Sequence, residues 1–161
     1  EDDVGAGIPG LTSPGQGIVY DEVRNAVNNR GVTDVSIMGY SQGGGSTYNL
    51  SWWLNDRRQA GEINPYNLVF TAYVDGVDDD GPHAETKLPV ATQWHLNLYQ
   101  DADEPVFDDI LFLDGTDVAG SNESYNVEVR WSMPWITHLT IDDDLRVKDY
   151  VKLRYRQNVS R

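Results

Sequence analysis

The sequence predicts an α/β fold, with a mainly parallel sheet flanked by helices. Stretches whose apolar residues recur at helical spacing alternate along the chain with short apolar runs of strand length. This alternation is typical of parallel sheets covered by helices. A length of 161 residues, 39% of them hydrophobic, is enough for one domain with a buried core. We expect residues 1–17, which are rich in glycine and proline, to form an N-terminal loop and residues 18–161 to form a single domain.

The first half of this domain reads as helix, strand, helix and strand. The spacing predicts helices over 18–30 and 46–61 and strands over 32–40 and 67–76, with Gly31 ending the first helix. The apolar residues that define the two helical faces are Val19, Val23 and Val27 in the first helix and Leu50, Trp53 and Leu54 in the second. The run "NLVFTAYVDG" is apolar throughout, which fits a strand buried on both faces of the sheet.

The second half adds three candidate strands and a closing helix. We expect strands over 92–100, 109–115 and 125–132 and a helix over 141–159. The apolar face of that helix consists of Val147, Tyr150, Val151 and Tyr155. The aspartates that precede it are suited to cap its N-terminus.

Charge and composition exclude several classes of partner. The net charge of −14 argues against binding of nucleic acid or anionic lipid, both of which require basic surfaces. No run approaches the roughly 20 apolar residues of a membrane span. Cysteine is absent, which excludes disulfides and thiolate metal sites. A surface this acidic suits a secreted or extracellular setting, where salt screens its self-repulsion. The alternative is an acidic surface that serves solubility alone.

The segment "MGYSQGGG" has the sequence of a nucleophile elbow. A strand leads into Gly39-Tyr40-Ser41-Gln42-Gly43, and an amphipathic helix follows. A sharp turn at this point raises the Ser41 hydroxyl above the sheet, and side chains at positions 39 and 43 would collide with neighbouring backbone. The backbone N–H of Gln42 is then suited to donate to a developing oxyanion. The alternative is a glycine-rich turn in which Ser41 only caps the helix.

A serine nucleophile requires a base to take its proton. His83 lies in a polar loop, and His95 lies inside a predicted strand, where a packed or hydrogen-bonded role is expected. His138 lies between the last predicted strand and the last helix, where a loop returns to the carboxyl edge of the sheet. We therefore expect His138 to be the base.

The base in turn requires an orienting acid. Asp75 ends the strand that follows the serine helix, and strands deliver functional groups at their carboxyl ends. Asp117 ends a later candidate strand and is the main alternative. Weaker candidates, which a solvated loop explains equally well, are Asp78, Asp101, Asp103 and Asp114.

The segments "GYSQGG", "YVDGVD", "NLYQ" and "THLTID" together resemble the α/β-hydrolase superfamily, and more narrowly its bacterial lipase- and esterase-like members. The resemblance covers roughly residues 18–157. It implies a serine hydrolase that cleaves carboxylic esters, with Ser41, Asp75 and His138 as the catalytic triad and no cofactor or metal. It also favours Asp75 over Asp117 and implies a small-molecule ester or lipid substrate. The alternative is a non-catalytic binding or structural domain that retains an incomplete hydrolase fold.

The chain departs from this family at its N-terminal side. Only 33 residues precede "DVSIMGYS", whereas a full α/β-hydrolase has several strands ahead of the nucleophile strand. We therefore expect a fold that is truncated or reduced at the N-terminus, without the loop that gives the second oxyanion donor. The segment "GAGIPG" at 5–10 is a candidate substitute for that donor.

Two further patterns remain. The aspartate clusters "DGVDDDG" and "DADEP" carry oxygen ligands of the kind Ca²⁺ prefers, but they lack the spacing of a calcium loop, and we expect solvated acidic loops. Trp131 and Trp135 flank the segment that carries His138. One of them is a candidate to line an acyl or aromatic pocket, and core packing is the alternative.

Overall fold

A computed structural model of the chain describes residues 17–77, 84–101 and 115–159. Its elements are α1 (Ile18–Arg30), β1 (Asp34–Tyr40), α2 (Gly43–Gln59), β2 (Asn67–Val74), η1 (Ala84–Thr86), β3 (His95–Tyr99), β4 (Glu123–Asn126), α4 (Val127–Trp131), α5 (His138–Ile141) and α6 (Leu145–Val159).

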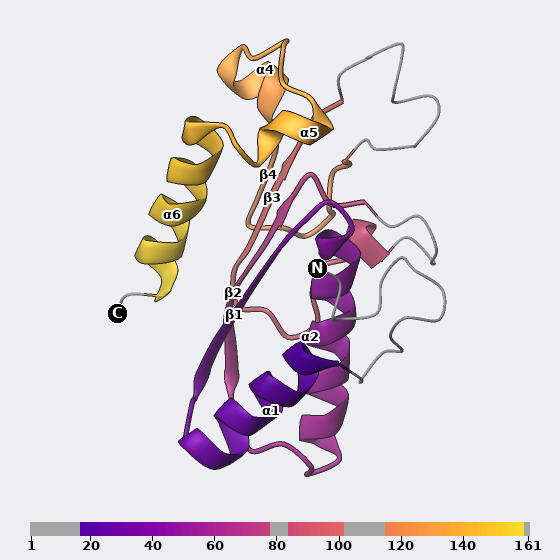
Figure 1. Cartoon of the computed structure of the whole chain (residues 1–161), viewed down its shortest axis with the longest axis vertical. Helices are drawn as coiled ribbons and strands as arrows, with labels where there is room; N and C mark the ends of the chain where they lie inside the picture. Colours follow the sequence, from indigo (N-terminus) through magenta and orange to yellow (C-terminus); the bar gives the residue numbers. More distant parts are fainter. Residues whose placement is uncertain (1–16, 78–83, 102–114, 160–161) are drawn as a thin grey trace.

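The four strands form one parallel sheet in the order β1-β2-β3-β4. Helices α1 and α2 cover one face of this sheet and α6 covers the other, which gives three layers (Figure 1). The predicted α/β class with a parallel sheet is therefore confirmed. Because the strands are parallel, their carboxyl ends all meet at one edge of the sheet, and the short helices α4 and α5 lie at that end (Figure 1).

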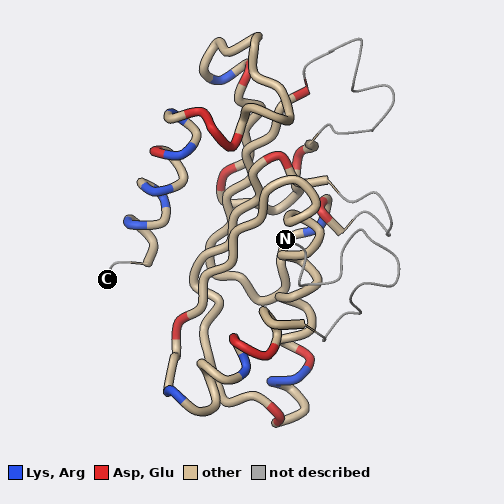
Figure 2. The backbone as a smooth tube through the Cα atoms, in the orientation of Figure 1, with Lys and Arg blue, Asp and Glu red and all other residues tan. Residues whose placement is uncertain are grey.

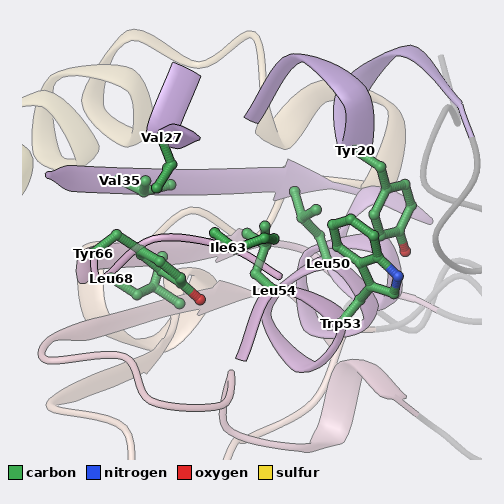
Figure 3. Close-up of a cluster of buried hydrophobic side chains, with 9 residues drawn as sticks. All are labelled: Tyr20, Val27, Val35, Leu50, Trp53, Leu54, Ile63, Tyr66 and Leu68. Atoms are coloured by element: carbon green, nitrogen blue, oxygen red, sulfur yellow. The ribbon is translucent and has the colours of Figure 1, made fainter. Parts of the chain in front are cut away.

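Two clusters of buried apolar side chains hold the layers together. The first packs α1 and α2 against the sheet (Figure 3) and consists of Tyr20, Val27, Val35, Leu50, Trp53, Leu54, Ile63, Tyr66 and Leu68. The second lies on the α6 side and consists of Phe70, Ala72, Leu96, Leu98, Val127, Met133, Ile136, Ile141 and Val147. Each large apolar side chain that is fully buried contributes about 1.5–3 kcal/mol to folding.

A β-bulge in β2 divides this strand between the two clusters. Val35 pairs with Leu68, but the next residue of β1, Ser36, pairs with Phe70, so Val69 is an extra residue in the ladder. Leu68 therefore belongs to the first cluster and Phe70 to the second.

The helical faces predicted from the sequence are confirmed in most of their residues, but Tyr155, which was placed on the apolar face of the last helix, is 38% exposed. Leu50, Trp53 and Leu54 are buried in α2, and Val147 is buried in α6. Gly31 ends α1 as predicted, with a φ of 72° in the left-handed region that glycine adopts without strain.

The predicted strand over 125–132 is wrong in most of its length. β4 ends at Asn126, and α4 begins at Val127. The Asn126 side chain accepts a hydrogen bond from the backbone N–H of Val129 at 3.1 Å, and this side-chain cap starts the helix. Val127 is buried whereas Val129 is 81% exposed, so the apolar alternation of this segment does not describe one face of a strand.

Two predicted helices have different bounds, and one predicted strand lies outside the described residues. The helix expected over 141–159 begins at Leu145 as α6, while Ile141 ends the separate short helix α5, and α2 begins at Gly43 rather than at 46. Asp144 does cap α6, because its Oδ1 accepts from the backbone N–H of Arg146 at 2.8 Å. Of the strand predicted over 109–115, the structure describes only Gly115. Within the described residues, no helix has the length and apolarity required to cross a membrane.

Acidic side chains outnumber basic ones among the described residues, but α6 is an exception. Figure 2 shows several basic residues along this helix. They are paired locally: Arg146 with Asp144 at 3.1 Å, and Arg154 with Glu123 at 2.6 Å. The basic helix is thus largely neutralised by its neighbours, and these pairs join it to the preceding turn and to β4.

The glycine-rich start of α2 lies directly against the loop that follows β2. A Cβ added at Gly44 would lie 2.6 Å from the Cα of Gly76, so the two backbones approach more closely than any side chain permits. The expectation that a side chain at position 43 would collide with backbone is wrong, because a Cβ at Gly43 has no atom within 4 Å. Gly44, and not Gly43, is therefore required for the contact between α2 and β2.

Gly44→Ala is expected to lower the free energy of unfolding by about 2–3 kcal/mol, since two backbone segments would have to separate. Gly43→Ala is the matched control. Because alanine favours a helix, this variant should raise the free energy of unfolding by less than about 1 kcal/mol. Urea unfolding monitored by circular dichroism measures both. Equal midpoints for the two variants would contradict the close approach of Gly44 and Gly76.

Candidate active site

Ser41 lies in the turn between β1 and α2 and has a φ of 55°, which is uncommon for a residue other than glycine. The turn is held by backbone hydrogen bonds. The Ser41 N–H donates to the carbonyl of Val74 at 3.2 Å, and the Ser41 carbonyl accepts from Gly44 at 2.9 Å and from Val77 at 3.0 Å. A Cβ at Gly39 would lie 1.8 Å from the carbonyl oxygen of Gly43, so the turn requires glycine two residues before the serine.

His138 is the first residue of α5 and is 5% exposed. A capping box between Thr137 and Thr140 starts this helix, and Ile141 anchors it in the second apolar cluster. The imidazole is bonded on both sides: Nε2 lies 2.8 Å from the hydroxyl oxygen of Ser41, and Nδ1 lies 2.8 Å from Oδ2 of Asp75.

Asp75 follows the last residue of β2 and is fully buried. While Oδ2 contacts His138, Oδ1 accepts hydrogen bonds from the backbone N–H groups of Gln100 and Gly115, both at 3.1 Å. A Cβ at Gly115 would lie 2.4 Å from Oδ1, so only glycine permits this approach. The carboxyl group is thereby fixed by backbone from two other segments of the chain.

The arrangement forms a continuous chain of hydrogen bonds from hydroxyl to imidazole to carboxyl. A hydroxyl bonded to an imidazole can transfer its proton to the ring, and a carboxylate on the opposite nitrogen stabilises the charge that the ring then carries. Ser41, Asp75 and His138 come from segments that are 34 and 63 residues apart in the sequence, and the fold brings all three together.

The other candidate acids do not reach the imidazole where the structure describes them. Asp117 is exposed, and so is Asp101. Asp78, Asp103 and Asp114 lie outside the described residues, as does His83. The carboxyl group bonded to His138 is that of Asp75.

His95 has the packed role that the sequence predicts. It is fully buried between β2 and β3, where its Nδ1 lies 2.8 Å from the Thr71 hydroxyl and its ring meets Tyr73 edge to face. Burial lowers the pKa of His95 to about 3. Its buried Nε2 has no hydrogen-bond partner in the described part of the chain, so a second ring proton would have no acceptor there.

Gln42 follows Ser41 directly and occupies the N-cap position of α2. The start of a helix carries the positive end of the helix dipole, which favours a negative charge that develops beside it. The role of Gln42 stays a prediction. The candidate second donor at 5–10 lies outside the described residues.

Three features of the site were not found from the sequence. They are the backbone N–H groups of Gln100 and Gly115 and the side chain of Tyr40, which contacts His138. Gln100 and Gly115 each end a predicted strand, and this position is the one sign in the sequence that they lie near the site. Tyr40 lies inside the elbow segment, but the pattern Gly-x-Ser-x-Gly assigns no role to the residue before the serine.

The remaining candidates are the two aspartate clusters and the two tryptophans near His138. The described residues contain no group of three or more histidine, cysteine, aspartate or glutamate side chains suited to hold a metal ion. Most of the two aspartate clusters lies outside the described residues. Trp131 lines an open groove of about 470 Å³ with Arg146, Tyr150 and other residues of α6, and Trp135 is 61% exposed. An acyl or aromatic pocket formed by either indole stays a prediction.

Comparison of the chain with protein-family models, with curated proteins and with solved structures gives no match.

His95 is expected to make the fold less stable in acid. Because the pKa of His95 is about 3 in the folded protein, against an ordinary value of about 6.5, the unfolded chain binds a proton that the folded protein does not. The stability that this residue contributes is complete above pH 6.5 and falls by up to about 1.4 kcal/mol per pH unit as the pH drops toward 3. Urea unfolding of wild type and His95→Gln at pH 7.5 and 4.5 tests this. The wild type should lose more stability than the variant, and parallel losses would contradict the prediction.

Proposed function

We propose that this protein is a serine hydrolase of the α/β-hydrolase type that cleaves carboxylic esters. The observation that carries the proposal is the hydrogen-bonded chain from Ser41 through His138 to Asp75. The order of these residues along the sequence, serine, acid and histidine, is that of the superfamily the sequence resembles. The left-handed backbone of Ser41 at the end of a parallel strand further supports a nucleophile elbow.

In the first half of the proposed reaction, His138 Nε2 takes the proton of the Ser41 hydroxyl as the oxygen attacks the ester carbonyl. A tetrahedral intermediate forms with its negative charge on the former carbonyl oxygen. Its collapse breaks the bond to the alkoxy oxygen, and His138 returns the proton to the departing alcohol. Ser41 is then acylated, and Asp75 stabilises the imidazolium formed on the way.

In the second half, His138 takes a proton from a water molecule, whose oxygen attacks the acyl carbonyl. The second tetrahedral intermediate releases the carboxylic acid, and the proton returns to the Ser41 oxygen. The protein is restored without any net gain or loss of protons, electrons or cofactor.

The proposed oxyanion donor is the backbone N–H of Gln42, at the start of α2. Loss of one such donor reduces kcat by about 10²–10³. The rate of the proposed reaction therefore depends strongly on whether a second N–H donates to the same oxygen.

We further propose that the sheet corresponds to the C-terminal part of the α/β-hydrolase sheet. In that superfamily several strands precede the nucleophile strand. Among the described strands β1 carries the nucleophile at its end and lies at an edge of the sheet, where such preceding strands would be added.

A fluorophosphonate probe tests whether Ser41 is a nucleophile. The expected result is covalent labelling of the native protein at neutral pH, complete loss of labelling in Ser41→Ala, and retained labelling in Ser36→Ala, which changes a serine on the same strand. Hydrolysis of p-nitrophenyl esters should likewise be lost in Ser41→Ala and retained in Ser36→Ala. A native protein that neither reacts with the probe nor cleaves esters would instead indicate the non-catalytic binding domain.

Asp75→Asn should lower kcat for ester hydrolysis by about 10³–10⁴, because an amide at this position holds the imidazole in the wrong tautomer. Asp117→Asn, which removes a negative charge from an exposed position, is the matched control and should retain nearly full activity. Steady-state kinetics on one chromogenic ester compare the two. Should Asp117→Asn be the inactive variant, the proposed acid is wrong.

A further inference from the structure

We propose that Tyr40 is a positioning residue that holds the imidazole of His138 in the orientation required by Ser41. The inference rests on the proposed function and adds a fourth side chain to the site. Two contacts carry it. The Tyr40 hydroxyl donates a hydrogen bond to the backbone carbonyl of His138, and the two rings stack with their centroids 5.2 Å apart and their planes at 24°.

These contacts supply a constraint that the acid alone does not. The hydrogen bonds of Nδ1 to Asp75 and of Nε2 to Ser41 fix two points of the ring, but they do not oppose a tilt of the ring about the line that joins these two nitrogens. Stacking against Tyr40 opposes the tilt from one face. The bond to the backbone carbonyl fixes the segment from which the ring extends. Both the plane and the anchor point of the imidazole thus depend on Tyr40.

The position of Tyr40 in the sequence links the nucleophile directly to the base. It is the residue immediately before Ser41, at the end of β1, whereas His138 is 98 residues further along the chain. Any shift of the elbow moves Tyr40 and Ser41 together, and the contacts of Tyr40 carry His138 in the same direction. The distance between nucleophile and base is therefore maintained by a connection that includes neither reacting atom.

The surroundings of Tyr40 suit this role. Burial, with the charges of Asp142, Asp75 and Asp143, raises the pKa of Tyr40 to about 12, so its hydroxyl keeps the proton that it donates to the His138 carbonyl. Tyr40 also lines a mainly apolar groove of about 330 Å³ between β1 and α6. A smaller side chain at position 40 would both free the imidazole to tilt and open its face toward this groove.

Two substitutions separate the contacts. Tyr40→Phe keeps the stacked ring and loses the hydrogen bond, and it should lower the rate of fluorophosphonate labelling and kcat about 3- to 10-fold. Tyr40→Leu loses both contacts and should lower them about 10²-fold, the loss expected for a small misplacement of a reacting group. KM should change little in either variant, because Tyr40 acts on the proton transfer and not on binding.

Tyr73→Phe is the matched control. Its hydroxyl also donates to a backbone carbonyl, that of Lys87 at 2.9 Å, but this bond does not involve His138. Tyr73→Phe should lower the urea midpoint about as much as Tyr40→Phe and leave the labelling rate unchanged. A purely structural role for Tyr40 would give the same result for both phenylalanine variants.

Nuclear magnetic resonance of ¹⁵N-labelled histidine gives a readout that does not require activity. The ring resonances of His138, assigned with a histidine variant, should shift and broaden in Tyr40→Leu, while those of His95 stay unchanged. Unaltered labelling rates and unaltered His138 resonances in both Tyr40 variants would overturn the proposal. If the wild type shows no labelling and no ester cleavage, the proposed function fails, and the resonances alone then decide whether Tyr40 orients the ring.

Discussion

The buried carboxyl group of Asp75 is the constraint on which the site depends. A fully buried polar group is costly unless its hydrogen bonds are made, and each oxygen of this carboxyl group has at least one partner. Those partners come from the end of β3, from the segment before β4 and from α5. Folding of the parallel sheet and assembly of the site are therefore coupled, because each of these three segments that fails to dock removes one hydrogen bond from the buried carboxyl group.

Two of the four non-glycine residues with a positive φ in the described part of the chain lie at the same place. Ser41 and Asp75 both have left-handed backbone, a conformation that costs about 1–3 kcal/mol where the residue is not glycine. The strain is opposed by hydrogen bonds that each turn makes to the other: Ser41 receives a bond from Val77, two residues after Asp75, and donates to Val74, the residue before it. The turns after β1 and β2 therefore hold one another, and the hydroxyl and the carboxyl group keep a fixed separation in which the imidazole fits.

Periodicity and turn residues predicted most elements, because those signals are local. The order of strands is not local, and this is why the acid remained open between Asp75 and Asp117. Each ends or follows a predicted strand, but β2 is the neighbour of β1, so Asp75 lies beside the turn that carries Ser41. Asp117 lies only two residues after Gly115, whose N–H reaches Asp75, but the side chain of Asp117 is exposed. The error at 125–132 has a different cause. There a side-chain cap at Asn126 starts a helix in a segment whose apolar residues happen to alternate.

The acid and the base of the site are supported by different parts of the chain. Asp75 lies toward the interior of the sheet and is held by backbone N–H groups, which a change of side chain does not remove, although Gly115 admits no Cβ. His138 lies on the side of β1, an edge strand among those described, and the ring that stacks against it is a side chain. The orientation of the base is therefore far easier to alter by substitution than that of the acid. Under the proposed function, substitutions on the β1 side of the site should therefore change the rate most, because β1 has a neighbouring strand on one side only among the strands described.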